Sequence, residues 1–188
     1  MLFLSFALAC APAPSGAGDT AADCPWAEPT NTWPVSAPTG CPQPEGFSAG
    51  EVVPDVRLPD QFGDTVALWQ FSGDLLLLDF SSMWGVQMWP RELAALGAEY
   101  ADAGLTTVSV IVEDQYGETA DTADLRDWQA ATGAVGPVLS DPEVYRSQVS
   151  SEEAWPEILL IGRDLRVLEA GLRWQEEGEI RARVEEQL

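Results

Sequence analysis

The side chains in this sequence that are best suited to chemistry are three cysteines, Cys10, Cys24 and Cys41, and no cysteine follows Cys41 in the 188 residues. Histidine is absent, which excludes Ser-His-Asp triads, Cys-His dyads and histidine-ligated zinc. A thiol reacts as its thiolate, which needs electropositive surroundings or a helix N-terminus. The elements that surround each cysteine therefore decide what it can do.

The charge of the chain limits the partners that it can bind. Asp and Glu number 31 against 9 Lys and Arg, which gives a formal net charge of -22 at pH 7. A surface this acidic repels phosphate backbones and anionic lipid headgroups. We therefore expect no nucleic-acid partner.

Cys10 ends the apolar N-terminal run "MLFLSFALAC", which is too short to span a bilayer and is typical of a secretory signal peptide. Its last four residues, "ALAC", resemble the lipobox of bacterial lipoprotein precursors, and in that interpretation Cys10 is lipidated. An ordinary signal peptide cleaved near Ala9 is the alternative. Both interpretations predict an exported protein. The first predicts a bacterial cell-envelope protein anchored to the membrane through Cys10, on the periplasmic or outer-membrane face.

Cys24 and Cys41 lie in a segment rich in Pro, Ala, Gly, Thr and Ser, from residue 11 to residue 49. Such a composition shows little apolar periodicity and predicts a tether. In an oxidising compartment the two cysteines most simply pair as a structural disulfide, worth about 3 kcal/mol in the chain-entropy model. A redox pair is the alternative, although the segment lacks the electropositive surroundings of reactive thiols. The predicted organisation is a leader at 1–10, a tether at 11–49 and a folded domain at 50–188.

The domain is predicted to begin with a β-hairpin. The stretch "DVRLPDQFGDTVALWQF", residues 55–71, alternates in polarity on either side of a turn at Gly63. Residues 75–80 form a continuous apolar run of strand length, as expected of a central strand covered on both faces. A helix is predicted from Pro90, with one apolar face made by Leu93, Leu96 and Tyr100.

The pattern continues with a strand over residues 106–113 and a helix capped by Asp121 or Thr122, whose apolar side carries Leu125, Trp128 and Thr132. "VGPVLSD" predicts a short strand, and "AWPEILLIGRDLRVLEAGL" predicts two strands that turn at "GRDL". The last helix places one stripe of side chains together, Ile180, Val184 and Leu188. The fold class is therefore α/β, a central mixed β-sheet flanked by helices with an N-terminal β-hairpin extension.

This order of elements, with its local motifs, resembles the thioredoxin-like redoxin family, which includes the TlpA-like thiol-disulfide oxidoreductases and the alkyl hydroperoxide reductase/thiol-specific antioxidant peroxiredoxins. The resemblance covers residues 50–188 and is found in "GEVVPDVRLPDQFGDTVALWQFSGDLLLLDF", "MW", "GLTTVSVIVED" and "AWPEILLIGRDLRV". It implies a thioredoxin-like fold with a cis peptide bond between Trp155 and Pro156. A parallel-sheet α/β domain of another family is the alternative.

The chemistry of this family resides in W-C-x-x-C, directly after the first buried strand, and the present chain departs from that motif. Aligned on Trp84, the two cysteine positions fall on Gly85 and Met88, within "WGVQM". The peroxidatic pattern P-x-x-x-T-x-x-C is also absent. Attack on a disulfide or a peroxide needs a thiolate, which neither Met88 nor Ser82 can supply. We therefore expect no catalytic residue at this turn, and no cofactor.

Three tryptophans, Trp84, Trp89 and Trp155, are expected near this face if the family geometry holds. The resemblance implies that an extended peptide can lie against the segment before Pro156, a short form of strand addition. A binding surface of this kind can persist after the cysteines are lost. The alternative is that the tryptophans fill the core or cover helix ends.

The acidic loop "EDQYGETADTAD", residues 113–124, raises a calcium hypothesis. Its spacing lacks the alternating oxygen ligands of an EF-hand-type loop. Asp121 and Asp124 suit the start of a helix instead. We therefore expect a solvated loop that leads into a capped helix, and no metal site.

Two functions remain open from the sequence. The preferred one is a non-catalytic thioredoxin-fold lipoprotein that binds an extracytoplasmic protein or peptide, because a fold does not by itself confer an activity. The other is a thiol-disulfide oxidoreductase or antioxidant protein that uses Cys24 and Cys41 in thiol-disulfide exchange, with this pair docked over the turn at Trp84.

Overall fold

The computed structural model describes residues 26–84, 89–142, 145–150, 155–172 and 178–188. Short 3-10 turns lie at Leu68–Gln70 and Ala101–Ala103. The helices and strands are, in chain order, β1 (Arg57–Pro59), β2 (Thr65–Ala67), β3 (Leu75–Ser82), α1 (Trp89–Tyr100), β4 (Leu105–Glu113), α2 (Thr122–Thr132), β5 (Val138–Ser140), α3 (Arg146–Val149), β6 (Glu157–Ile161), β7 (Val167–Glu169) and α4 (Glu179–Gln187).

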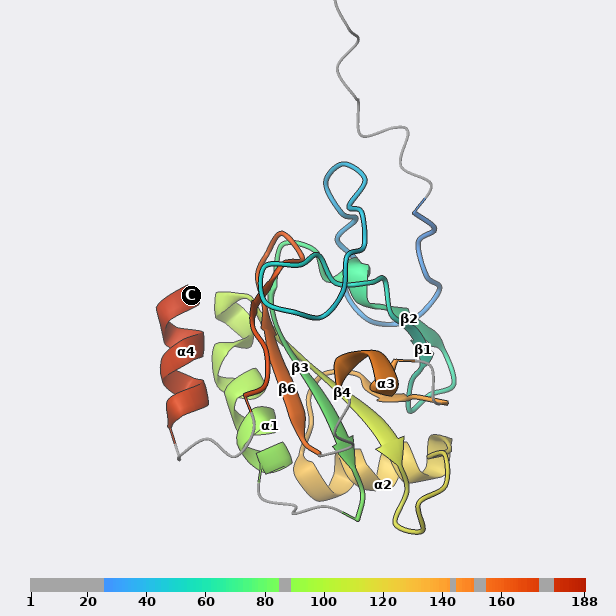
Figure 1. Cartoon of the computed structure of the whole chain (residues 1–188). Helices are drawn as coiled ribbons and strands as arrows, with labels where there is room; N and C mark the ends of the chain where they lie inside the picture. The colour runs from blue at the N-terminus through green and yellow to red at the C-terminus, as the bar shows by residue number, and fades with distance from the viewer. Residues whose placement is uncertain (1–25, 85–88, 143–144, 151–154, 173–177) are drawn as a thin grey trace, which may run out of the picture.

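Five strands form a mixed central sheet in the order β5-β4-β3-β6-β7. β3 pairs in parallel with β4, and β4 pairs in parallel with β5. β6 runs antiparallel to both β3 and β7. The hairpin of β1 and β2 forms a separate antiparallel sheet. Figure 1 shows β3, β4 and β6 side by side, with α1 and α4 adjacent to each other at one side of the molecule.

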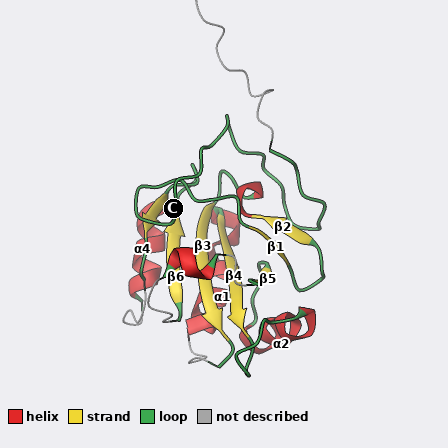
Figure 2. Ribbon diagram, turned by 45° about the vertical axis from the view of Figure 1, so that its right-hand side comes forward, coloured by secondary structure: helices red, strands yellow, loops and turns green. Residues whose placement is uncertain are grey.

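β3 lies at the centre of the sheet, and all of its residues are buried. Side chains alternate between the two faces of a strand, so Leu76 and Leu78 pack in one cluster while Leu75 and Leu77 pack in another. α1, α2 and α4 cover the face of Leu75. The hairpin, α3 and the residues before β1 cover the opposite face (Figure 2). This double cover explains why the strand begins with four consecutive leucines, at residues 75–78.

α2 begins as the sequence predicts. The Asp121 carboxylate accepts hydrogen bonds from the N–H groups of Ala123 (2.7 Å) and Asp124 (3.1 Å), and the Asp124 carboxylate accepts one from the Asp121 N–H (2.9 Å). This reciprocal pair satisfies donors at the helix N-terminus that otherwise have no partner. The helix ends at Gly133, which adopts the left-handed conformation (φ 79°) typical of that position.

The two hairpins and the last helix follow the sequence pattern, with one exception. Gly63 makes the β1–β2 turn with a positive φ of 89°, and β6 and β7 are joined through the predicted "GRDL" turn. In α4, Ile180 and Val184 are buried, as predicted. Leu188 is exposed, because it lies beyond the last turn of the helix, so the predicted stripe is wrong at this residue.

Residues 26–49 pack against the domain, which differs from the tether expected from their composition. The indole N–H of Trp33 donates a hydrogen bond to Asp60 (2.8 Å). Phe47 is buried and packs edge to face against Phe80, with ring centroids 6.2 Å apart. A few aromatic side chains in this segment therefore bury enough apolar area to hold it against the domain. The average composition of the segment does not show this.

The predicted lipid anchor at Cys10 lies outside the described residues, so membrane attachment stays a prediction. Within the part of the chain that the structure describes, no helix combines the length and the apolar character needed to cross a bilayer.

Cys24 also lies outside the described residues, and Cys41 is exposed. We expect mass spectrometry under non-reducing conditions to find the two joined. Replacing both by serine should lower the free energy of unfolding by about 3 kcal/mol, because the bond closes a loop in a packed segment rather than in a free tether. Urea unfolding measures the change. A loss under about 0.5 kcal/mol, the range of neutral surface substitutions, would show that the segment packs without help from the bond.

Candidate functional site

The candidate site lies at the carboxyl ends of β3, β4 and β5, which meet at one edge of the sheet because these strands are parallel. β6 is antiparallel to them and starts at the same edge, where Glu157 is paired with Phe80. The Trp155–Pro156 bond that precedes β6 is cis, as the resemblance to the redoxin family implies. Ligands of open α/β sheets commonly bind outside the carboxyl ends of the strands.

The predicted site residues differ in their exposure, and some of them lie outside the part of the chain that the structure describes. Gly85 and Met88 lie outside the described residues. Trp84 is 54% exposed at the end of the β3 segment. Trp155 is only 8% exposed and belongs to the core cluster of the sheet, so core filling, the alternative reading, describes it. Trp89 begins α1, and its side chain lies outside the description.

One carboxylate orients the exposed tryptophan. The indole N–H of Trp84 donates a hydrogen bond to Oε2 of Glu113 (2.7 Å), at the end of β4. Oε1 of the same carboxylate forms an ion pair with Nη1 of Arg146 (2.8 Å), the first residue of α3. The Asp141 carboxylate in turn accepts the Arg146 backbone N–H (2.7 Å). The Trp84 ring is therefore both solvent-accessible and held in position from two neighbouring elements.

Glu113 and Asp114, at the start of the acidic loop, use their carboxylates in hydrogen bonds and an ion pair within the protein. Glu113 binds Trp84 and Arg146, and Asp114 accepts hydrogen bonds from the N–H groups of Tyr116 (2.7 Å) and Glu118 (2.8 Å). In the described part of the chain, no cluster of acidic or cysteine side chains could hold a metal ion. The loop thus supplies hydrogen-bond acceptors that shape this edge of the sheet.

Sequence reasoning missed a buried acid beneath the site. Asp79 in β3 is almost fully buried, and its Oδ1 accepts a hydrogen bond from the Ser81 hydroxyl (2.7 Å). Its Oδ2, like the Ser82 hydroxyl, has no partner among the described residues. Burial raises the pKa of Asp79 from 3.8 to about 7, against the smaller opposing effect of the Ser81 hydrogen bond. The signal was an acidic residue inside the apolar run "LLLLDF".

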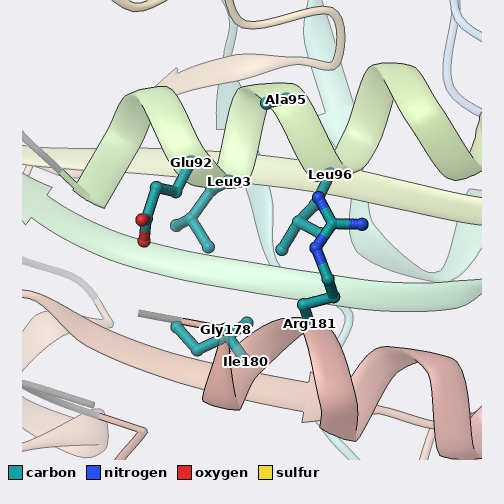
Figure 3. A pocket seen from close by; sticks show the side chains of 7 residues that line it. All are labelled: Glu92, Leu93, Ala95, Leu96, Gly178, Ile180 and Arg181. Atoms are coloured by element: carbon teal, nitrogen blue, oxygen red, sulfur yellow. The ribbon is translucent and has the colours of Figure 1, made fainter. Parts of the chain in front are cut away.

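A cavity of about 320 Å³ lies between α1 and α4. Figure 3 shows Leu93 and Leu96 of α1 on one side of it and Ile180 of α4 on the other. Arg181, its basic residue, is already paired with Glu99 (2.8 Å), and its hydrogen bond lowers the pKa of that carboxyl group. Residues 173–177, next to this cavity in the chain, lie outside the described residues. The cavity therefore offers mainly apolar contacts and adds nothing to the site at Trp84.

No protein-family model matches the sequence. No curated protein matches it either. Solved structures do resemble it. The thioredoxin domain of a thiol-disulfide oxidoreductase from Bacteroides vulgatus has 17% sequence identity and a TM-score of 0.60, over 75% of this chain and 98% of that one.

Two further solved structures agree with the first. A thiol:disulfide interchange protein from Bacteroides sp. has 19% identity and a TM-score of 0.57, over 76% of this chain and 90% of that chain. A thiol-disulfide oxidoreductase from Bacteroides fragilis has 15% identity and a TM-score of 0.59, over 75% of this chain and 100% of that chain. At these identities the likeness establishes the fold. The thioredoxin-like fold predicted from the sequence is therefore confirmed.

Proposed function

We propose that this chain is an exported, lipid-anchored thioredoxin-fold protein that binds an extended peptide or a partner protein at the Trp84 edge and does not catalyse thiol-disulfide exchange. The observation that supports this proposal most directly is the exposed Trp84 ring, held by Glu113 at the carboxyl end of the sheet. Tryptophan is enriched among residues that dominate binding energy. No cysteine follows Cys41 in the sequence, so the strands and helices that form this edge carry no thiol.

Active thiol-disulfide exchange by Cys24 and Cys41 is the second candidate. Cys41 lines a hollow of about 420 Å³ together with Trp26, Arg57 and Trp69, and a nearby guanidinium favours a thiolate. However, Arg57 is already paired with Asp55 (2.7 Å). The loop around residue 41 lies at the end of the molecule opposite to the carboxyl end of β3 (Figures 1 and 2), which argues against docking over Trp84.

The binding proposal is tested with an extended peptide that cannot exchange disulfides, the S-alkylated insulin B chain. Replacing Trp84 by alanine should weaken its binding about tenfold or more, because truncating a central aromatic anchor costs about 2 kcal/mol. Isothermal titration calorimetry measures the dissociation constant. Phe62→Ala is the matched control, because Phe62 is exposed to a similar extent (56%) but lies in the β1–β2 turn. Equal binding by the wild type and the Trp84 variant would contradict the proposal.

A further inference from the structure

The two oxygens of the Glu113 carboxylate have different partners at the Trp84 edge. Oε2 accepts the Trp84 indole N–H (2.7 Å), and Oε1 accepts a hydrogen bond from Nη1 of Arg146 (2.8 Å). The side chains of Glu113 and Arg146 are only 23% and 22% exposed, so their ion pair is partly shielded from water and stronger than one on an open surface. Rotation of the carboxylate breaks both bonds at once, which links the position of the ring to that of the arginine.

The short helix α3 is fixed where it begins, at Tyr145 and Arg146. The buried Asp141 carboxylate accepts the backbone N–H groups of Tyr145 (3.2 Å) and Arg146 (2.7 Å). The Tyr145 ring packs edge to face against Phe47, with ring centroids 6.4 Å apart, and Phe47 packs in the same way against Phe80 of β3. A helix of four residues has little stability of its own, so these contacts decide where the Arg146 guanidinium lies.

The Trp84 ring has freedom to lose when a partner binds. The side chain is 54% exposed and rotates about two bonds, so without a fixed hydrogen-bond acceptor it can adopt several rotamers. A peptide that binds a mobile ring must also immobilise it, and this loss of freedom weakens binding. The charge-assisted hydrogen bond to Glu113 fixes the ring before the peptide arrives.

We propose that Arg146 is a positioning residue for the Trp84 ring: acting through Glu113, it holds the ring in the orientation that binds the peptide, without contacting the peptide itself. The segment of residues 26–49 supports the binding edge as well, because its Phe47 packs against Tyr145 at the start of α3. This inference rests on the proposed peptide-binding function of the Trp84 edge.

The first test measures binding of the S-alkylated insulin B chain by isothermal titration calorimetry. Arg146→Met should weaken binding about fivefold, because the ring must then be immobilised during binding. Glu113→Gln, which keeps the shape of the side chain but removes its charge, should have a similar effect. Arg146→Lys should retain most of the affinity, because the ion pair uses a single nitrogen that an ammonium group can replace. Arg183→Met, which removes an ion pair between α4 and Glu169 (3.2 Å), should bind as the wild type does.

A double variant separates positioning from direct contact. In the Trp84→Ala background, Arg146→Met should cause no further loss of binding, because the arginine acts only through the ring. A second fivefold loss in that background would show that Arg146 contacts the peptide itself, and would overturn the inference.

The second test observes the ring without any peptide. In 15N-labelled protein, the Trp84 indole resonance is the one missing from Trp84→Phe. In Arg146→Met its proton should move upfield, as expected when a hydrogen bond to a carboxylate is weakened, and its order parameter should fall. Arg146→Lys should restore both values. An indole resonance and order parameter that are the same in Arg146→Met as in the wild type would overturn the inference, whatever the binding data show.

The binding results distinguish the two proposals. If Trp84→Ala weakens peptide binding and Arg146→Met does not, the peptide-binding function stands and the positioning role of Arg146 is refuted. If Trp84→Ala binds as tightly as the wild type, the proposed function itself is refuted, together with the inference that rests on it.

Discussion

Between pH 4 and pH 8 the wild-type protein should lose about 4 kcal/mol of folding free energy through Asp79, and the Asp79→Asn variant should not show this loss. The folded-state pKa is about 7, against 3.8 for an unperturbed group, and each unit corresponds to about 1.4 kcal/mol. The folded carboxyl group holds a proton that the unfolded one releases. The stabilising contribution is thus complete below about pH 4, is lost as the pH rises toward 7, and changes no further above it.

The sequence makes this titration easy to isolate. No histidine is present, so no other side chain with an ordinary pKa changes charge between pH 5 and pH 8 apart from the start of cysteine ionisation. The acids whose pKa is lowered, Glu45, Glu99 and Asp121, act at lower pH, with the opposite sign, in both proteins. Urea unfolding at a series of pH values measures the difference. Parallel stability curves for the wild type and the variant would contradict a buried, protonated Asp79.

The second prediction with a large effect is a gain of catalytic activity. Gly85→Cys together with Met88→Cys should give the protein measurable disulfide-exchange activity. Position 88 directly precedes α1, a helix of 12 residues that starts at Trp89. A helix N-terminus lowers the pKa of a nearby thiol and increases its thiolate fraction at neutral pH. The turnover of insulin with dithiothreitol, measured by turbidity, should rise several-fold above that of dithiothreitol alone.

The control for this gain is a cysteine pair at a turn without such a helix. Phe62→Cys with Asp64→Cys places two thiols in the β1–β2 turn, where no helix begins. That variant should show the background rate. Equal activity in the two double variants would mean that the N-terminus of α1 contributes nothing to thiol reactivity, and would contradict the explanation given for the gain.

The fold was predictable because local sequence patterns indicate most of its helices and strands. The four consecutive leucines that begin β3 indicate cover on both faces, and Asp121 indicates the start of α2. α3 was not predicted, because four residues carry no periodic signal. The packing of residues 26–49 was missed for a related reason. Single aromatic residues such as Phe47 decide that packing. Their effect is lost when the composition is averaged over a segment rich in proline and glycine.

The site was less predictable than the fold. Trp84, Glu113 and Arg146 are brought together by pairing between strands and by α3, across sequence separations of 29 and 33 residues. No local pattern records such contacts. The sequence alone also does not distinguish an outward-facing tryptophan from one that fills the core, so no local pattern separates the exposed Trp84 from the buried Trp155. The burial of Asp79 follows only from the cover of both sheet faces, which is a property of the assembled domain.

The central claim is that the Trp84 edge binds but that no thiol of this protein turns over substrate. It is tested most directly by insulin reduction with the purified, unmodified protein, with Gly85→Cys/Met88→Cys as the positive control. Our account predicts the rate of dithiothreitol alone for the unmodified protein, because no cysteine follows Cys41 and a thiolate is required for exchange. Rapid turnover that disappears in Cys24→Ser or Cys41→Ser would contradict the account and make that pair the active site.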